Sequence, residues 1–118
     1  MPDDLVDRAV FAELQATAGA DFIVELVDTF LAEAPGLLAN LRDAYAGAES
    51  ERFRRAAHSL KSNASTFGAT RLAALARELE HSGLAGGQQK TAAALTALEA
   101  DYAKVAAKLT TLKDLPHG

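Results

Sequence analysis

The sequence predicts an all-α fold, an antiparallel up-down four-helix bundle with a short extra helix at the N-terminus. Three observations lead to this prediction. Apolar residues recur at three- and four-residue spacing through most of the chain. Alanine and leucine are abundant, whereas there are only three prolines and 6% aromatic residues, a composition that favours closely packed helices. The breaks between periodic segments are short, and short connections make consecutive helices antiparallel neighbours.

Length and composition indicate a single domain that spans residues 1–118. With 49% hydrophobic and 24% charged residues, a chain of 118 residues can bury one core without disulfides or metals. There is no cysteine, which excludes thiolate metal sites. The net charge of −4 makes nucleic acid an unfavourable partner. No apolar stretch is long enough to span a membrane and the opening MPDDLVDRAV lacks the pattern of a secretory signal, so we expect a cytoplasmic protein.

The first expected helix is short and begins at the N-terminus. Its predicted start has residues that suit the first turn of a helix: Pro2, Asp3 and Asp4. Its apolar positions recur every four residues, at Val6, Val10 and Leu14. The sequence Thr17-Ala18-Gly19 interrupts this pattern and ends the helix.

The second expected helix is long and begins at Asp21, which can cap its first turn. Its apolar stripe consists of Phe22, Ile23, Leu26, Val27, Phe30, Leu31, Ala34, Leu37, Leu38 and Leu41. The stripe continues in phase through Pro35 and Gly36. We therefore predict one helix kinked at the proline, in place of two helices and a loop.

Three more helices are expected after the break at residues 46–48. The third covers roughly residues 50–67 and the fourth roughly residues 70–82, with a turn at Gly68 between them. A loop at residues 83–87 leads to a last long helix, whose apolar positions are Ala94, Leu95, Leu98, Tyr102, Val105, Leu109 and Leu112. The tail at residues 116–118 is expected to fray.

The third expected helix, ESERFRRAAHSLKSNASTF, has an unusual polar face. At about 100° per residue its apolar side chains fall on one arc, which we expect to be buried: Phe53, Ala56, Ala57, Leu60, Ala64 and Phe67. His58 lies on the opposite face, together with Arg54, Lys61, Ser62 and Ser65. A nucleophile that attacks phosphorus needs a free lone pair, an open approach and nearby positive charge. His58 has this setting, because Lys61 supplies charge one turn away and the small Ser62 leaves room.

The segment AHSLKSNASTFGATRLAALARELE, from Ala57 to Glu80, resembles the signature of the histidine-containing phosphotransfer family. The positions that carry the resemblance are His58, Leu60, Lys61, Ser62, Gly68, Leu72, Leu75, Leu79 and Glu80. Two positions depart from the family pattern. Ser62 stands where the family commonly has glycine, and Arg77 stands where the chemotaxis-kinase branch often has a second histidine.

The resemblance implies a phosphorelay carrier that is not itself an enzyme. His58 would accept the phosphoryl group, Lys61 would lie near its oxygens, and Glu80 would orient the imidazole by a hydrogen bond. The partners would be response-regulator receiver domains, which supply Mg²⁺, and through them a sensor or hybrid histidine kinase. The chain would bind no cofactor of its own and act as a monomer. A docking surface around His58 would include Arg54, Arg55, Ser62, Ser65 and Gly68.

Three alternatives compete with this hypothesis. A dimeric histidine kinase typically follows its histidine with an acidic residue and a proline, whereas Ser-Leu-Lys-Ser-Asn follows here, and no Gly-rich ATP-binding segment is present. The three histidines, His58, His81 and His117, lack a metal-binding spacing, so no metal site is expected. The third alternative is a helical interaction module that has lost phosphotransfer, and the sequence leaves it open.

Overall fold

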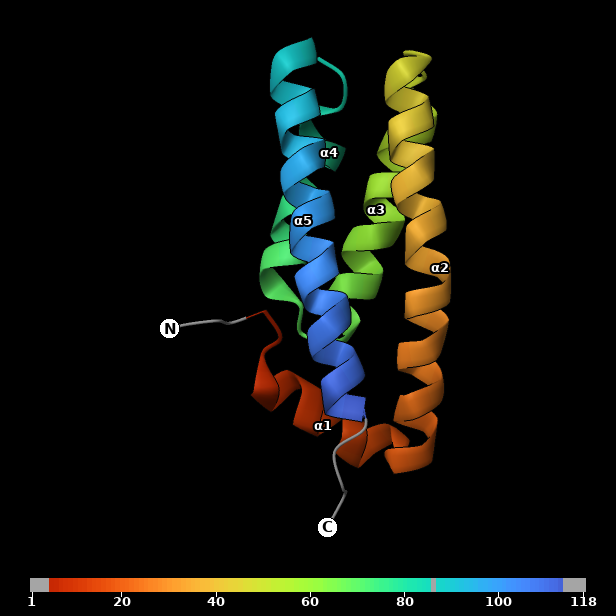
Figure 1. Ribbon diagram of the computed structural model, residues 1–118, viewed down its shortest axis with the longest axis vertical. Helices are drawn as coiled ribbons and strands as arrows, with labels where there is room; N and C mark the ends of the chain where they lie inside the picture. The colour runs from red at the N-terminus through yellow and green to blue at the C-terminus, as the bar shows by residue number, and fades with distance from the viewer. Residues whose placement is uncertain (1–4, 86, 114–118) are drawn as a thin grey trace.

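The computed structural model describes residues 5–85 and 87–113 (Figure 1). These residues form five helices: α1 (Arg8–Ala18), α2 (Ala20–Ala46), α3 (Ser50–Thr66), α4 (Thr70–Ser82) and α5 (Gln88–Lys113). The described part of the chain contains no β-strand. The predicted all-α fold is confirmed, and so is the single long second helix, because α2 continues through Pro35.

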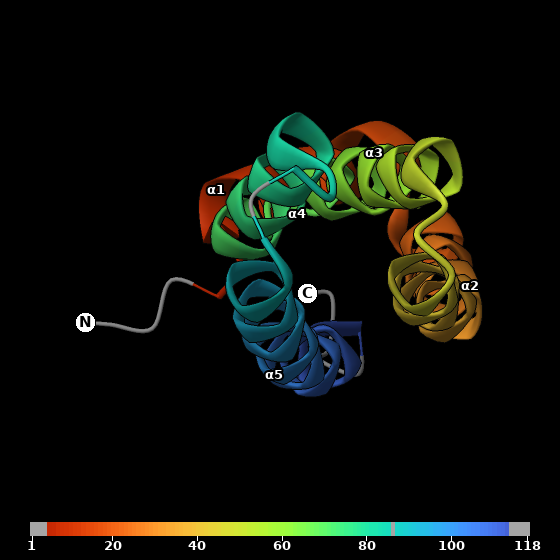
Figure 2. The ribbon, with the colours of Figure 1, turned by 90° about the horizontal axis from the view of Figure 1, so that it is seen from above.

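The four longer helices form the bundle, and consecutive members run antiparallel (Figure 1). Seen from the end of the bundle, α3 contacts α2 and α4, and α5 closes the ring by contacting α4 and α2 (Figure 2). The short helix α1 contacts α2 at one end of the bundle. This arrangement is the up-down bundle with an extra N-terminal helix that the sequence predicts.

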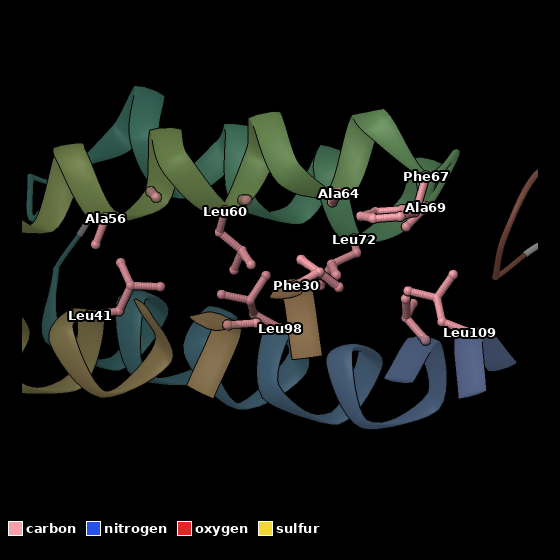
Figure 3. Packing of buried hydrophobic residues seen from close by; sticks show 14 of the residues in the cluster. Phe30, Leu41, Ala56, Leu60, Ala64, Phe67, Ala69, Leu72, Leu98 and Leu109 are labelled. Atoms are coloured by element: carbon pink, nitrogen blue, oxygen red, sulfur yellow. The ribbon is translucent and has the colours of Figure 1, made fainter. Parts of the chain in front are cut away.

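The core lies between α2 and α5 on one side and α3 and α4 on the other (Figure 3). Leu60 points from α3 toward Leu98 of α5, and both side chains are fully buried. Phe30 of α2 connects two parts of the core, since its ring centroid lies 5.4 Å from that of Phe67 and 5.9 Å from that of Tyr102. The apolar arc predicted for α3 is therefore the face that packs.

Helix α1 begins later than the sequence predicts. Its N-cap is Asp7, whose Oδ1 accepts hydrogen bonds from the backbone N–H groups of Ala9 and Val10 at 3.0 and 3.3 Å. Asp7 also donates its backbone N–H to the carbonyl of Gly68 at 2.7 Å, which ties the start of α1 to the turn between α3 and α4. Phe11 is buried and Val10 is 37% exposed, so the predicted stripe is wrong at Val10, whereas Val6 is buried and Leu14 packs against the core as expected. The predicted start at Pro2, Asp3 and Asp4 lies outside the described residues.

The start of α2 also differs from the prediction. The helix begins at Ala20, and Gly19 is its N-cap with a φ of 93°, a conformation that glycine adopts without strain. Asp21 lies in the first turn and makes no capping hydrogen bond. Phe22, which was predicted on the buried stripe, is half exposed. Because Gly19 both ends α1 and begins α2, no room remains for a separate capping residue.

Asp101 of α5 is a buried carboxyl group with incomplete hydrogen bonding. It is 5% exposed, its Oδ1 lies 3.5 Å from Nε of Arg71, and its Oδ2 has no partner among the described residues. Burial raises the pKa of the Asp101 carboxyl, and the charges of Arg71 and Lys104 oppose this only in part. The folded state thus holds the proton of Asp101 more tightly than the unfolded chain does. The contribution of Asp101 to the free energy of unfolding therefore falls as pH rises from the usual pKa of a carboxyl group through the raised one.

An Asp101→Asn variant is expected to gain stability over wild type as pH rises, because the amide keeps the shape of the side chain without its charge. The difference in free energy of unfolding should grow steadily from pH 3 to pH 7. Urea unfolding followed by circular dichroism at several pH values measures it. Asp21→Asn, at an exposed position, is the matched control. If the free energies of unfolding of Asp101→Asn and wild type differ by the same amount at every pH, burial does not raise the pKa of Asp101.

Candidate functional site

His58 lies on the outer face of α3, in the middle of the helix. The side chains on the opposite face, Phe53, Ala57 and Leu60 among them, are fully buried, and they fix how α3 is rotated in the bundle. As a result 56% of the His58 side chain is exposed. The predicted outward orientation of His58 is therefore present in the structure.

One carboxylate, that of Glu80, joins the two functional side chains of α3. Its Oε2 lies 2.7 Å from Nδ1 of His58, and its Oε1 lies 2.9 Å from Nζ of Lys61. Glu80 reaches them from α4, which packs along α3. The exposed fractions of Glu80 and Lys61 are 19% and 28%, so both groups are partly shielded from water. The sequence analysis expected the contact between Glu80 and His58 but not the ion pair between Glu80 and Lys61.

The contacts of Glu80 determine its charge and the tautomer of His58. Hydrogen bonds from Lys61, and then from His58, lower the pKa of the Glu80 carboxyl. Glu80 is therefore ionised at neutral pH and accepts the proton of Nδ1–H. In the neutral imidazole Nε2 then carries the free lone pair, and it points away from Glu80. The stabilisation from this carboxylate is present above the usual carboxyl pKa and is lost as pH falls through the lowered one.

A Lys61→Met variant is expected to raise the pKa of the Glu80 carboxyl toward its ordinary value, because it removes the main cause of the lowering. A pH titration of the Glu80 side-chain carbon by nuclear magnetic resonance measures the change. Lys90→Met, at an exposed position of α5, is the control and should leave Glu80 unaffected. An unchanged Glu80 titration in Lys61→Met would show that the ion pair does not form in solution.

A groove of about 860 Å³ runs beside His58, between α2 and α3. On the side of α3 it is lined by His58, Ser59, Ser62 and Asn63. On the side of α2 half of its lining residues are alanine or glycine: the lining consists of Ala32, Glu33, Gly36, Leu37, Ala39 and Asn40. The nucleophile candidate thus stands at the edge of an open concave surface, and Glu80 stands on its other side.

The family of Hpt domains matches residues 25–108, more than two thirds of the chain. The chain belongs to the Hpt domain family. It is 32% identical over 72 residues to the phosphorelay protein LuxU of Vibrio harveyi, in an alignment that covers 61% of this chain and 63% of LuxU. The matched part is thus less than two thirds of the length of LuxU.

The fold is also similar to a solved structure of the family. The crystal structure of histidine-containing phosphotransfer protein B (HptB) from Pseudomonas aeruginosa PAO1 matches with a TM-score of 0.87 and 28% sequence identity. The match covers 98% of this chain and 100% of HptB, so the extra helix α1 is included in the similarity. The family resemblance inferred from the residues between Ala57 and Glu80 is confirmed.

The structure places the predicted docking residues of this Hpt domain in different settings. Ser62 lines the groove and Ser65 is exposed. Arg54 and Arg55 are exposed, but both pair with Glu51, at 2.5 and 3.6 Å. One carboxylate, that of Glu51, therefore already pairs with both arginines.

Gly68, which was predicted to contact a partner, is buried in the turn between α3 and α4. Its φ is 76°, and a Cβ atom there would lie 2.9 Å from Cβ of Val10 and 3.0 Å from the carbonyl oxygen of Asp7. Glycine is required at this position by the close approach of α1, and Gly68 is not part of the exposed surface around His58.

Sequence reasoning missed the α2 side of the groove, including Glu33 and Gly36. In the sequence, the one local sign of this wall is the Pro35-Gly36 pair inside a helix, and the sequence analysis interprets the pair only as a kink. Among the described residues no three acidic or histidine side chains gather where they could hold a metal ion, and no helix is long and apolar enough to cross a membrane. His81 is exposed in the last turn of α4, and His117 lies outside the described residues.

Proposed function

We propose that this Hpt domain carries a phosphoryl group on Nε2 of His58 and exchanges it with aspartates of response-regulator receiver domains. The observation that carries the proposal is the contact between Nδ1 of His58 and the Glu80 carboxylate at 2.7 Å. It holds the ring proton on Nδ1 and directs the Nε2 lone pair outward from an exposed side chain. A sensor or hybrid histidine kinase would feed the relay through such a receiver.

The chemical step is a displacement at phosphorus. The Nε2 lone pair attacks the phosphorus of an aspartyl phosphate, a nitrogen–phosphorus bond forms, and the phosphorus–oxygen bond to the aspartate breaks. The aspartate leaves as a carboxylate with the bonding electrons. No proton has to leave Nε2, because the ring proton is on Nδ1. The phosphorylated ring carries positive charge, which the carboxylate of Glu80 beside Nδ1 offsets.

The remaining parts of the proposal follow from this step. Lys61 stabilises the phosphoryl oxygens, and Mg²⁺ is held by the receiver, so the Hpt domain acts as substrate and carrier. Contact with the receiver involves the exposed face around His58, with Ser62 and Ser65 near the histidine and Arg54 and Arg55 toward the start of α3. We further propose that residues 1–118 act as one monomeric domain in the cytoplasm.

Phosphate transfer from a labelled receiver tests the function. A receiver domain carrying ³²P on its aspartate is mixed with the Hpt domain, and the expected product is label on the Hpt domain that is stable to alkali and labile to acid. Receivers encoded in the same genome supply the candidates. If none of them transfers label, the interaction-module alternative is favoured over phosphotransfer.

A Lys61→Ala variant is expected to accept phosphate on the order of tenfold more slowly, because it lacks the cation that shares the Glu80 carboxylate with His58. Binding of the receiver should stay within a factor of about two, since the Lys61 side chain is only 28% exposed and offers little contact surface. Rapid-quench measurement of label and a separate binding titration distinguish the two effects. An unchanged transfer rate would contradict phosphate stabilisation by Lys61.

A further inference from the structure

Gly36 lies in the middle of α2, on the wall of the groove that His58 also lines. Glycine in a helix interior lowers stability relative to alanine, because more backbone entropy is lost on folding. Pro35, directly before it, cannot donate the usual backbone hydrogen bond within the helix. Two residues unfavourable to a helix thus stand together at the part of α2 that faces His58.

The fold itself does not explain the glycine. Gly36 is not among the glycines with positive φ, so its backbone conformation is open to other residues. A Cβ atom built on Gly36 meets nothing within 4 Å, so no neighbour in this chain excludes a side chain. Gly68 is the contrast, because its φ is positive and a Cβ there would collide with α1. The space in front of Gly36 is empty because the groove is open.

This space belongs to the groove at whose edge phosphate would be exchanged. Reacting atoms must approach to about 3–3.5 Å, so a receiver that brings its aspartyl phosphate to Nε2 of His58 is in contact with the surface around it. His58 is itself part of the groove lining, together with Ser62 from α3. A receiver surface that extends from its aspartate toward α2 therefore meets this groove.

We propose that Gly36 sets how closely a receiver domain can approach His58, as a specificity-determining residue of the docking groove. The receiver's surface beside its phospho-aspartate occupies the volume that a side chain at position 36 would fill. Glu33, on the same wall, has no ion pair among the described residues and favours a receiver with a cation at that point. This inference rests on the proposed phosphotransfer function. It adds the residue Gly36 and a physical reason, which is the room that a missing side chain leaves for the receiver.

Substitutions that differ in size at position 36 test the proposal. The receiver that exchanges phosphate fastest with wild type is used throughout. Gly36→Leu should slow transfer about 100-fold, and Gly36→Ala should fall between Gly36→Leu and wild type. Gly36→Ala should also raise the midpoint of thermal unfolding by about 3 °C, because alanine favours the helix. If Gly36→Ala is more stable than wild type and still transfers phosphate more slowly, damage to the fold does not explain the slower transfer.

Two controls separate this proposal from the function on which it rests. Ala103→Leu introduces the same leucine side chain on an exposed part of α5, the helix diagonally opposite α3, and should transfer at the wild-type rate (Figure 2). Phosphoramidate, a small phosphoryl donor, should label wild type and both Gly36 variants equally, because it does not need the groove.

Two outcomes overturn the proposal, and they are distinguishable. If Gly36→Leu exchanges phosphate with the receiver as fast as wild type does, the role of Gly36 is rejected while the phosphotransfer function stands. If wild type takes label from phosphoramidate but from no receiver, both the function and the role of Gly36 are rejected.

Discussion

A His58→Gln variant of this Hpt domain is expected to accept no phosphoryl group from any receiver. Glutamine has an amide in place of the ring nitrogen, and an amide nitrogen has no free lone pair to attack phosphorus. The loss should exceed a factor of about 1,000 in transfer rate, since the nucleophile itself is removed. The fold should remain intact, because more than half of the His58 side chain is exposed and its substitution opens no cavity.

Acid-labile ³²P on the purified variant, after mixing with a labelled receiver, is the measurement. His81→Gln is the matched control, because His81 is also exposed but lies on α4 and contacts neither Glu80 nor Lys61 through a hydrogen bond. The control should be labelled at the wild-type rate. Label that persists on His58→Gln would place the phosphorylation site elsewhere.

The second large effect concerns stability. A Leu60→Ala variant is expected to lose about 2–5 kcal/mol in free energy of unfolding, because Leu60 is fully buried and faces Leu98 across the core (Figure 3). Total stabilities of domains are about 5–15 kcal/mol, so this is a large fraction. The same side chain also fixes the rotation of α3, and the variant should therefore bind a receiver less well at temperatures where it is partly unfolded.

Chemical unfolding in urea, followed by circular dichroism, measures the loss. Ser65→Ala lies on the exposed face of the same helix and should change the free energy of unfolding by no more than about 0.5 kcal/mol. A loss below about 1 kcal/mol in Leu60→Ala would mean that the core closes around the missing side chain.

The fold could be predicted wherever the pattern within one helix decides the outcome. The arc through Leu60 predicts the buried face of α3, and Thr70 and Ser82 are the first and last residues of α4 as expected. The start of α1 could not be predicted in the same way. It depends on the hydrogen bond between Asp7 and Gly68, which joins residues far apart in the sequence, and local helix propensity carries no information about such a contact.

The site could be predicted in part for the same reason. The exposure of His58 follows from the rotation of one helix, and the contact with Glu80 followed from the family resemblance. The ion pair between Lys61 and Glu80 and the groove beside α2 depend on the distances between helices. Those distances are set by packing across the whole bundle, so they became visible only in the structure.

The contact between His58 and Glu80 joins residues that are 22 positions apart, on two helices connected by one short turn. In a denatured chain nothing holds these side chains together, and the imidazole returns to the mixture of its two neutral tautomers. The tautomer of the His58 ring therefore depends on whether α3 and α4 are packed together. The nitrogen chemical shifts of His58 should therefore change when α3 and α4 separate, even where the rest of the bundle stays folded. These shifts measure local unfolding at the site itself.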